Sequence, residues 1–219
     1  VGVRGAPLAH LLAVLLGLAF LLPTAVGAAP FRFDESSKDY IKLYDGAKPV
    51  YRYVRGEVLP SGAPENRRRS TYIDPLYSLD CLPISEDGPK DHWHHRGLSW
   101  IWPRVTFDGV TKDLWTLRGV RQRYVKHESR VVQGRAVLKV TNYWEEDSTG
   151  RRLLDETVTL TTHAVDRQGR TIDFELQLAA IDTPVSIGTS ARGYGGLNIR
   201  FAPRKETTIT TSKGEVSTD

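Results

Sequence analysis

The chain of 219 residues contains no methionine and one cysteine, Cys81. A single cysteine forms no internal disulfide, so the fold must be held together without one. A buried thiol that packs as a small apolar group is the simplest role for Cys81. A nucleophilic role would require surroundings that lower the thiol pKa.

Several signatures of catalytic and binding sites are also missing. No glycine-rich loop follows a strand and opens a helix, so nucleotide binding has no support. There is no Gly-x-Ser-x-Gly elbow, and the 26 acidic residues form no privileged pair of the glycosidase kind. The only dense basic run, Arg67 to Arg69, lacks a supporting basic stripe. We therefore expect solvated arginines at a strand edge, and no nucleic-acid partner.

The two ends of the chain give further expectations. It begins with Val1, which suggests either a start codon translated as valine or a fragment. Residues 213 to 219 form a polar stretch with no closing element, so we expect a missing C-terminal portion.

An apolar run near the N-terminus predicts the compartment. Arg4 precedes the run from Leu8 to Leu22, and small residues follow up to Ala29. This layout predicts a signal peptide over residues 1–28 and an exported domain over residues 29–219, either secreted or periplasmic. A retained anchor is the alternative reading of the same run. No later segment is apolar enough to span a bilayer, so we expect no membrane association after cleavage.

Alternating apolar and polar residues dominate the remaining chain. The clearest alternation runs from Thr171 to Ala180, and Glu156 to Thr162 and Arg135 to Glu145 repeat it. Turn-forming residues separate these segments, and no helical period is convincing. The pattern predicts an all-β fold, an antiparallel β-sandwich or a barrel-like relative of one, with a mixed α+β domain as the alternative.

Half of the six histidines lie in one short segment, Pro89 to Gly97. Histidine titrates near neutral pH and commonly binds metals, so His92, His94 and His95 are the candidate catalytic residues. If the segment is extended, His92 and His94 point to one face, and Trp93 and His95 point to the other.

The proposed chemistry is proton transfer. One neutral imidazole would remove a proton from a hydroxyl or a ring carbon, and a protonated group would return one. Asp91 would orient an imidazole. Arg96, which is always charged, would hold a carboxylate or stabilise an oxyanion.

Two other readings of the histidines stay open. His92 and His94, with Asp91 or the distant Glu156, have the ligand types of a mononuclear zinc or iron site, which would make a divalent metal the cofactor. Alternatively, the histidines form a hydrogen-bonded polar knot that holds the loop.

Aromatic and basic side chains elsewhere are candidate ligand contacts. Trp93 and Trp100 offer flat apolar surfaces for a sugar ring, although tryptophan in a strand is commonly a core residue. Arg192 and Arg200 flank Tyr194 and the following glycine pair, where the backbone either approaches a ligand or forms a tight turn. A flanking arginine pair suits an anionic group.

The motifs resemble a known family. Tyr72, Pro75 to Ser78, the segment Asp91 to Gly97, and Tyr194 to Arg200 are similar to bacterial PmoA-like proteins, labelled "methane oxygenase PmoA". Those proteins are similar in turn to galactose-mutarotase-like sugar enzymes. The resemblance implies a supersandwich fold, a carbohydrate or polyol ligand, no obligatory cofactor, and Tyr72 among the binding residues.

This chain departs from that family at two positions. Asp74 stands in place of the family's usual histidine, and Cys81 in place of its usual glycine. Because the mature chain has no apolar span, it cannot be an integral methane monooxygenase subunit. The sequence therefore predicts an exported protein that binds or transforms a carbohydrate, through epimerase, lyase or hydrolase chemistry. A metal-dependent enzyme and a non-catalytic binding module are the alternatives, and the oligomeric state is left open.

Overall fold

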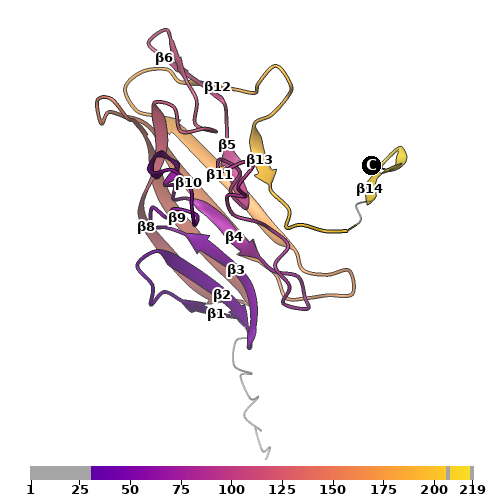
Figure 1. Ribbon diagram of the computed structural model, residues 1–219. Helices are drawn as coiled ribbons and strands as arrows, with labels where there is room; N and C mark the ends of the chain where they lie inside the picture. Colours follow the sequence, from indigo (N-terminus) through magenta and orange to yellow (C-terminus); the bar gives the residue numbers. More distant parts are fainter. Residues whose placement is uncertain (1–30, 206–207, 218–219) are drawn as a thin grey trace, which may run out of the picture.

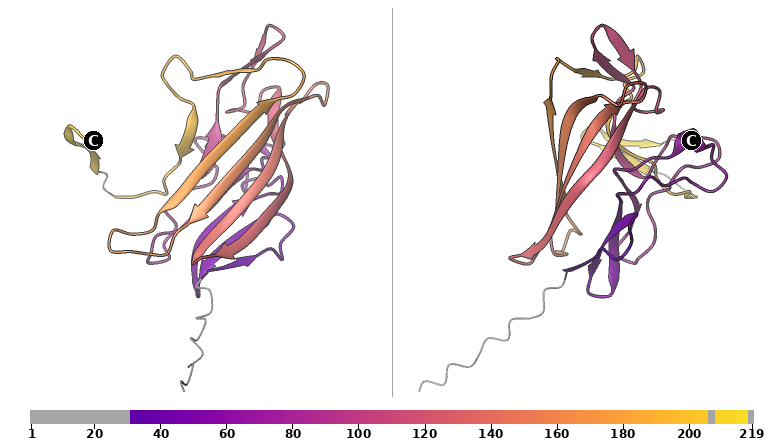
Figure 2. Two further views of the ribbon diagram at one scale, coloured as in Figure 1. Left: turned by 180° about the vertical axis from the view of Figure 1, so that it is seen from behind. Right: turned by 90° about the vertical axis from the view of Figure 1, so that its left-hand side faces the viewer.

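Two antiparallel sheets lie face to face in the computed structural model, which describes residues 31–205 and 208–217 (Figure 1). The right-hand view of Figure 2 shows them as separate layers. The all-β antiparallel sandwich expected from the alternating patterns is therefore confirmed. The signal peptide predicted over residues 1–28 lies outside the described residues.

The first sheet has six strands, in the order β1-β2-β3-β4-β5-β13. Its last strand returns from far along the chain to pair with β5, so the segment before β5 and the segment before β13 meet at one edge. The strands are β1 (Phe31–Asp34), β2 (Tyr40–Asp45), β3 (Lys48–Val54), β4 (Tyr72–Leu76), β5 (Leu98–Ile101) and β13 (Gly196–Ile199).

The second sheet is a four-stranded meander, in the order β11-β10-β9-β8. It contains the three strands predicted from alternation, and tight turns join its long members. Gln133 and Gly134, both with positive φ, form the turn between β8 and β9. The strands are β8 (Val120–Val132), β9 (Arg135–Glu146), β10 (Arg152–Thr162) and β11 (Ile172–Ala180).

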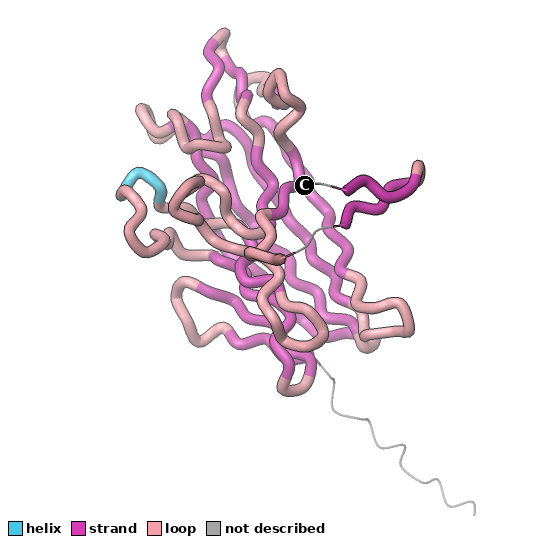
Figure 3. Tube along the Cα trace, turned by 45° about the vertical axis from the view of Figure 1, so that its right-hand side comes forward, coloured by secondary structure: helices cyan, strands magenta, loops and turns pink. Residues whose placement is uncertain are grey.

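Two small sheets complete the described chain. One has the order β12-β6-β7, and the other is the hairpin β14-β15. In Figure 3 this hairpin stands at one side of the sandwich, and the 3₁₀ turn η1 (Glu65–Arg67) lies among the loops. The strands are β6 (Arg104–Phe107), β7 (Val110–Lys112), β12 (Ser186–Gly188), β14 (Thr208–Thr211) and β15 (Gly214–Ser217). Within the described residues, no helix is long and apolar enough to cross a membrane.

The core lies between the two large sheets. Tyr53, Ile73 and Trp100 from the first sheet pack with Leu138 and Leu160 from the second, and all five are at most 1% exposed. Full burial of each such aliphatic side chain contributes about 1.5–3 kcal/mol to folding. A second cluster around β6 and the loop after β7 continues this core towards the end of the sandwich where β12 lies.

Cys81 does not pack in this core. Its thiol is free and only half-buried, in a turn where the cysteine backbone has φ 65°. The expectation of a buried cysteine is therefore wrong. The turn requires a left-handed residue at this position, and a residue in a surface turn meets few apolar neighbours.

Candidate functional site

The histidine segment, Pro89 to Gly97, leads directly into β5 and folds as two consecutive turns. The backbone N–H of His92 donates to the carbonyl of Pro89 at 2.8 Å, and that of His95 donates to the carbonyl of His92 at 2.9 Å. The segment is not extended, so the prediction that His95 points away from His92 and His94 is wrong. Side chains alternate between two faces only in a strand.

The three imidazoles form one cluster. The ring centroids of His92 and His95 are 4.7 Å apart with the rings stacked, at an interplanar angle of 21°. His94 meets His95 edge-on at 4.5 Å, and its centroid lies 5.6 Å from that of His92. His92 is exposed and the other two rings are half-buried, so the cluster is reachable from solvent.

The cluster opens onto a cavity of about 470 Å³ at the β5–β13 edge of the first sheet. Its volume lies within the range of about 300–1,000 Å³ that is usual for small-molecule sites. Three separate parts of the chain surround it: the histidine segment with β5, the loop after β7, and the segment around β13. The lining residues are His92, His94, His95, Arg96, Gly97, Ser99, Ile101, Trp115, Arg192, Tyr194, Asn198, Ile199 and Arg200.

Burial and neighbouring charges keep His94 and His95 deprotonated. Burial lowers the pKa of His94 to about 4, with further lowering by His95, His92, Arg67 and Arg69. Burial also lowers the pKa of His95, as do His92 and Arg200, while Asp91 acts in the opposite direction. At neutral pH His94 and His95 are therefore neutral imidazoles, each with one nitrogen lone pair that can accept a proton.

His92 has a carboxylate partner. Its Nδ1 lies 2.7 Å from Oδ2 of Asp91, as the orienting role of Asp91 predicts. This hydrogen bond lowers the pKa of Asp91, so the carboxylate is ionised at neutral pH. Because Nδ1 is engaged, Nε2 is the ring nitrogen of His92 left for another partner. Asp91 itself is exposed and does not line the cavity.

The opposite wall comes from the turn before β13. The Ser190 hydroxyl accepts hydrogen bonds from the backbone N–H groups of Arg192 (3.3 Å) and Tyr194 (3.1 Å), which fixes this turn. The Tyr194 ring is 57% exposed and lies 5.8 Å from the ring of Trp115. The Gly195 backbone packs against Trp102 and Thr189, Gly196 is the first residue of β13, and neither glycine lines the cavity.

Arg200 follows β13 and faces the histidine segment. Its Nε lies 3.4 Å from Oε2 of Glu86, and its Nη2 lies 3.8 Å from Oδ2 of Asp91. Its backbone N–H donates to the carbonyl of Gly97 at 2.7 Å, so β13 and the histidine segment are tied together beside the cavity.

Arg96 has a role different from the one predicted. It is 1% exposed, and its guanidinium bonds to the carboxylate of Asp87, the hydroxyl of Tyr72 and the carbonyl of Arg67. The Tyr72 hydroxyl in turn donates to Asp87 at 2.9 Å, and Tyr72 is fully buried. With these donors engaged, Arg96 and Tyr72 hold the loop from below. The buried Tyr72 does not line the cavity, so its predicted ligand contact is not supported, whereas Arg96 is part of the lining. The hydrogen-bonded polar network that was considered as the role of the histidines is formed instead by Arg96 with its partners.

Trp100 and Glu156 belong to the core. Trp100 is fully buried and donates its indole N–H to the Glu156 carboxylate at 3.0 Å. Glu156 also accepts hydrogen bonds from Asn142, Trp144 and Gln122, so it is no partner for the histidines. Both residues are therefore removed from the candidate site. They lie where the inward faces of the two sheets meet, and the alternation of β5 and β10 places them there.

Trp93 points away from the cavity that the imidazoles share. It is half-buried beside the arginine side chains of the 67–69 run, near Gly62. The second turn of the histidine segment sends it to that side, so the predicted sugar contact by Trp93 is not supported at this cavity.

The basic run, Arg67 to Arg69, fixes the loop that forms one wall of the cavity. The sequence did not predict this role. Nη1 of Arg67 donates to the carbonyl of Thr116 at 2.6 Å, and buried Arg69 donates to the carbonyls of Leu114 and Trp115. These bonds fix the loop that carries Trp115, whose ring lies 6.0 Å from that of His95. Only Arg68 of the run is exposed, so the expectation of three solvated arginines is wrong.

Comparison with known proteins identifies the family. A family of unknown function (DUF6807) matches residues 40–219. The chain belongs to DUF6807. No curated protein and no solved structure matches it. The DUF6807 region contains the whole cavity, from the histidine segment to Arg200. Its description states no activity, so the resemblance to PmoA-like and galactose-mutarotase-like proteins stays a prediction.

In the described part of this DUF6807 chain, no group of three His, Cys, Asp or Glu side chains is placed to hold a metal ion. The alternative of a zinc or iron site therefore has no arranged set of ligands there. The stacked arrangement of the His92 and His95 rings explains physically why these two side chains do not converge on one ion. Lone pairs lie in the plane of each imidazole, so two nearly parallel rings direct them side by side instead of toward one point. Asp91, the other near ligand, already bonds to Nδ1 of His92.

Proposed function

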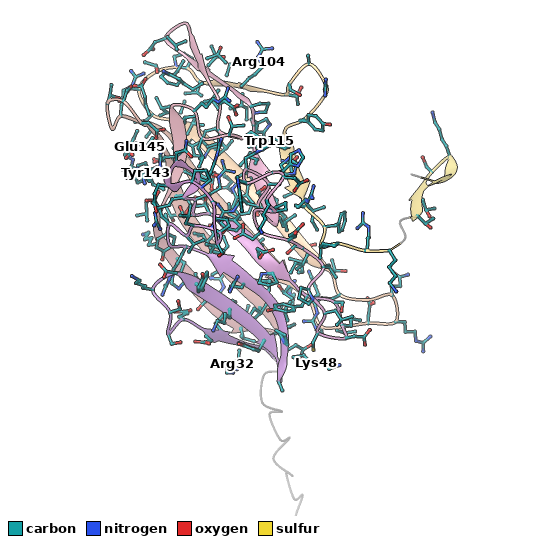
Figure 4. All side chains as sticks on the ribbon, viewed as in Figure 1. Arg32, Lys48, Arg104, Trp115, Tyr143 and Glu145 are labelled. Atoms are coloured by element: carbon teal, nitrogen blue, oxygen red, sulfur yellow. The ribbon has the colours of Figure 1, made fainter. Side chains whose placement is uncertain are left out.

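We propose that this protein binds a carbohydrate or related polyol and transforms it by proton transfer to and from its imidazoles. The observation that carries the proposal is the convergence of His92, His94 and His95 on one solvent-reachable cavity. Trp115 and Tyr194, whose rings adjoin in the cavity lining, supply flat apolar surfaces of the kind that pack against sugar rings. Figure 4 labels Trp115, beside the β13 segment.

The three rings suit different tasks. His94, kept neutral by burial and by its cationic neighbours, accepts a proton from a substrate hydroxyl or from a carbon next to a carbonyl. His92, oriented by the ionised Asp91, offers Nε2 for the return of a proton. His95 lies between them and contacts both rings. Such a division of roles fits an epimerase, a lyase or a hydrolase.

Export is part of the proposal. The N-terminal signal pattern supports a secreted or periplasmic location, where the protein would meet carbohydrates from outside the cell. Fractionation of cells that express the chain with a C-terminal tag tests this. Tagged protein of reduced mass outside the cytoplasm is expected, and uncleaved cytoplasmic protein would contradict it.

A ligand screen with matched variants tests the function. Thermal stabilisation is measured against neutral sugars, sugar acids, keto-sugars and polyols, because a ligand that prefers the native state raises its stability. Turnover of each stabilising ligand is then followed by NMR. We expect His94→Asn and His95→Asn to abolish turnover, with folding retained. His163→Asn is the matched control, since His163 lies outside the cavity and pairs with Asp173.

The outcomes separate three functions. Loss of turnover with ligand binding retained supports acid–base catalysis. Full affinity and no turnover in wild type and in both cavity variants would identify a carbohydrate-binding module that uses Trp115 and Tyr194. Stoichiometric metal in purified protein, lost together with activity on chelation, would favour the zinc or iron enzyme.

A further inference from the structure

We infer that the ligand of this cavity carries a carboxylate, as in a hexuronate, and that Arg192 and Arg200 recognise it. The inference rests on the proposed carbohydrate function and adds the charge of the substrate. Three observations support it: the hydrogen-bond donors that line the cavity, the lack of full charge partners for the two guanidinium groups, and the positive charge around the imidazoles.

The described residues of the lining are rich in hydrogen-bond donors and include no carboxylate side chain. Two arginines at its rim offer five N–H donors each. The one amide of the lining, Asn198, donates to the carbonyl of Gly196 within its own strand. Carboxylates are strong acceptors of hydroxyl protons, so a site for an uncharged polyol gains from them. A donor-rich wall is instead complementary to a ligand with negative oxygens.

The charge of Arg192 has no partner among the residues that the structure describes. Its backbone is fixed by Ser190, but its guanidinium forms no hydrogen bond or ion pair with any residue in ranges 31–205 and 208–217. A guanidinium presents paired N–H groups that match the two oxygens of a carboxylate. An arginine on a fixed turn, at the rim of a cavity, is placed for that contact.

Arg200 is compensated only in part. Its contacts with Glu86 and Asp91, at 3.4 and 3.8 Å, are longer than the 2.7–2.9 Å of a strong charge-assisted bond. Its side chain is 33% exposed, so a ligand carboxylate can share it. The two arginines bracket β13 in the cavity lining, and Arg200 also lies beside the histidine segment. A carboxylate between them would direct the remainder of a sugar toward the imidazoles.

The positive electrostatic potential within the cavity also favours a ligand that carries a carboxylate. The pKa values of His94 and His95 are lowered by cationic neighbours as well as by burial. A bound carboxylate would offset that field, so it should raise both pKa values, whereas an uncharged sugar supplies no such charge. This difference gives a readout that is independent of affinity.

Paired ligands test the inference by isothermal calorimetry. D-glucuronate and D-galacturonate are compared with D-glucose and D-galactose, which differ only at C6. We expect each acid to bind at least ten times more tightly than its parent sugar. Arg192→Gln should reduce this ratio to less than three. Arg130→Gln, at an exposed position on β8, is the control and should leave the ratio unchanged.

Histidine titration by NMR gives the second readout, with a rise in the pKa of His94 expected on addition of D-glucuronate and none on addition of D-glucose. Equal binding of acids and parent sugars, unaffected by Arg192→Gln, would overturn the inference and leave the carbohydrate function standing. Absence of binding by all four sugars would overturn the inference. The proposed function would fail as well only if the broader screen of polyols and keto-sugars also found no ligand.

Discussion

Replacement of Glu156 by glutamine tests how the two sheets are joined behind the cavity. The carboxylate is fully buried and accepts hydrogen bonds from two indoles and two amides, and no cationic side chain among the described residues pairs with it. One donor, Trp100, comes from β5 of the first sheet, while the other three lie on β8 and β9 of the second. The group therefore links the sheets directly behind the strand that carries the cavity.

The cost of Glu156→Gln can be worked out from these partners. A glutamine keeps one acceptor oxygen and places an NH₂ group where the other oxygen stood. On either side, that NH₂ meets one amide and one indole N–H. The amides of Gln122 and Asn142 can turn, because their own oxygens have no protein partner within the described residues. The indole cannot, so one buried donor is left unpaired, at a cost of about 1–3 kcal/mol.

Urea unfolding at pH 7, followed by tryptophan fluorescence, measures this cost. Glu175→Gln, at an exposed position of β11, is the matched control and should change the unfolding free energy by less than about 0.5 kcal/mol. Glu156→Leu removes all four acceptor contacts and should cost more than Glu156→Gln. An unchanged or raised stability of Glu156→Gln would refute the reasoning. It would mean that the native side chain is already protonated, or that burial of its charge costs more than the hydrogen bonds contribute.

Four further substitutions test the loop and its electrostatics. Asp87→Asn leaves the buried Arg96 without its carboxylate and should cost about 3–5 kcal/mol in urea unfolding. Gly97→Ala places a Cβ against the backbone oxygen of Ile73 at a positive φ, so a loss above about 2 kcal/mol is expected, and a neutral result would contradict the close packing. The lowered pKa of His94, about 4, makes the native state resist protonation, so stability falls as pH falls from 6.5 towards 4. His94→Asn should recover about 1 kcal/mol at pH 5 relative to pH 7, after allowance for solvent screening. Burial raises the pKa of Asp74 to about 6, so its contribution is present below pH 3.8 and is lost as pH rises through 6. Asp74→Asn should remove a loss of about 1 kcal/mol between pH 5 and pH 7, and an unaltered pH profile would argue against the shift.

The fold was predictable where one face of a strand is buried and the other is not. In β10 and β11, threonines and charged residues alternate with Val158, Leu160 and Phe174, and the strands end within a few residues of the predicted bounds. The strand β8 was missed because polar residues such as His127 and Ser129 occupy half-buried positions, which removes the alternation of apolar and polar residues. The strand β2 was missed although buried Ile41 and Leu43 flank Lys42, a signal that could have been used.

The candidate site was predictable only in part. Clustering in the sequence identifies the histidines, and the motif around β13 identifies Arg192 and Tyr194. Nothing local reveals Trp115, because the bonds that hold its loop are accepted by backbone carbonyls, which are the same for every residue type. For the same reason, the anchoring role of Arg69 depends on contacts 45 and 46 residues along the chain.

The short strand β13 connects ligand occupancy to the integrity of the sheet. Four residues pair it with β5, and its end is fastened to Gly97 beside the imidazoles. A strand this short at a sheet margin opens locally at a small fraction of the free energy of global unfolding. A molecule held between Arg192 and the histidines would have to leave before that opening. Amide protons of β13 should therefore exchange with solvent more slowly when the cavity is filled. Their exchange rates would report ligand occupancy without any probe on the ligand itself.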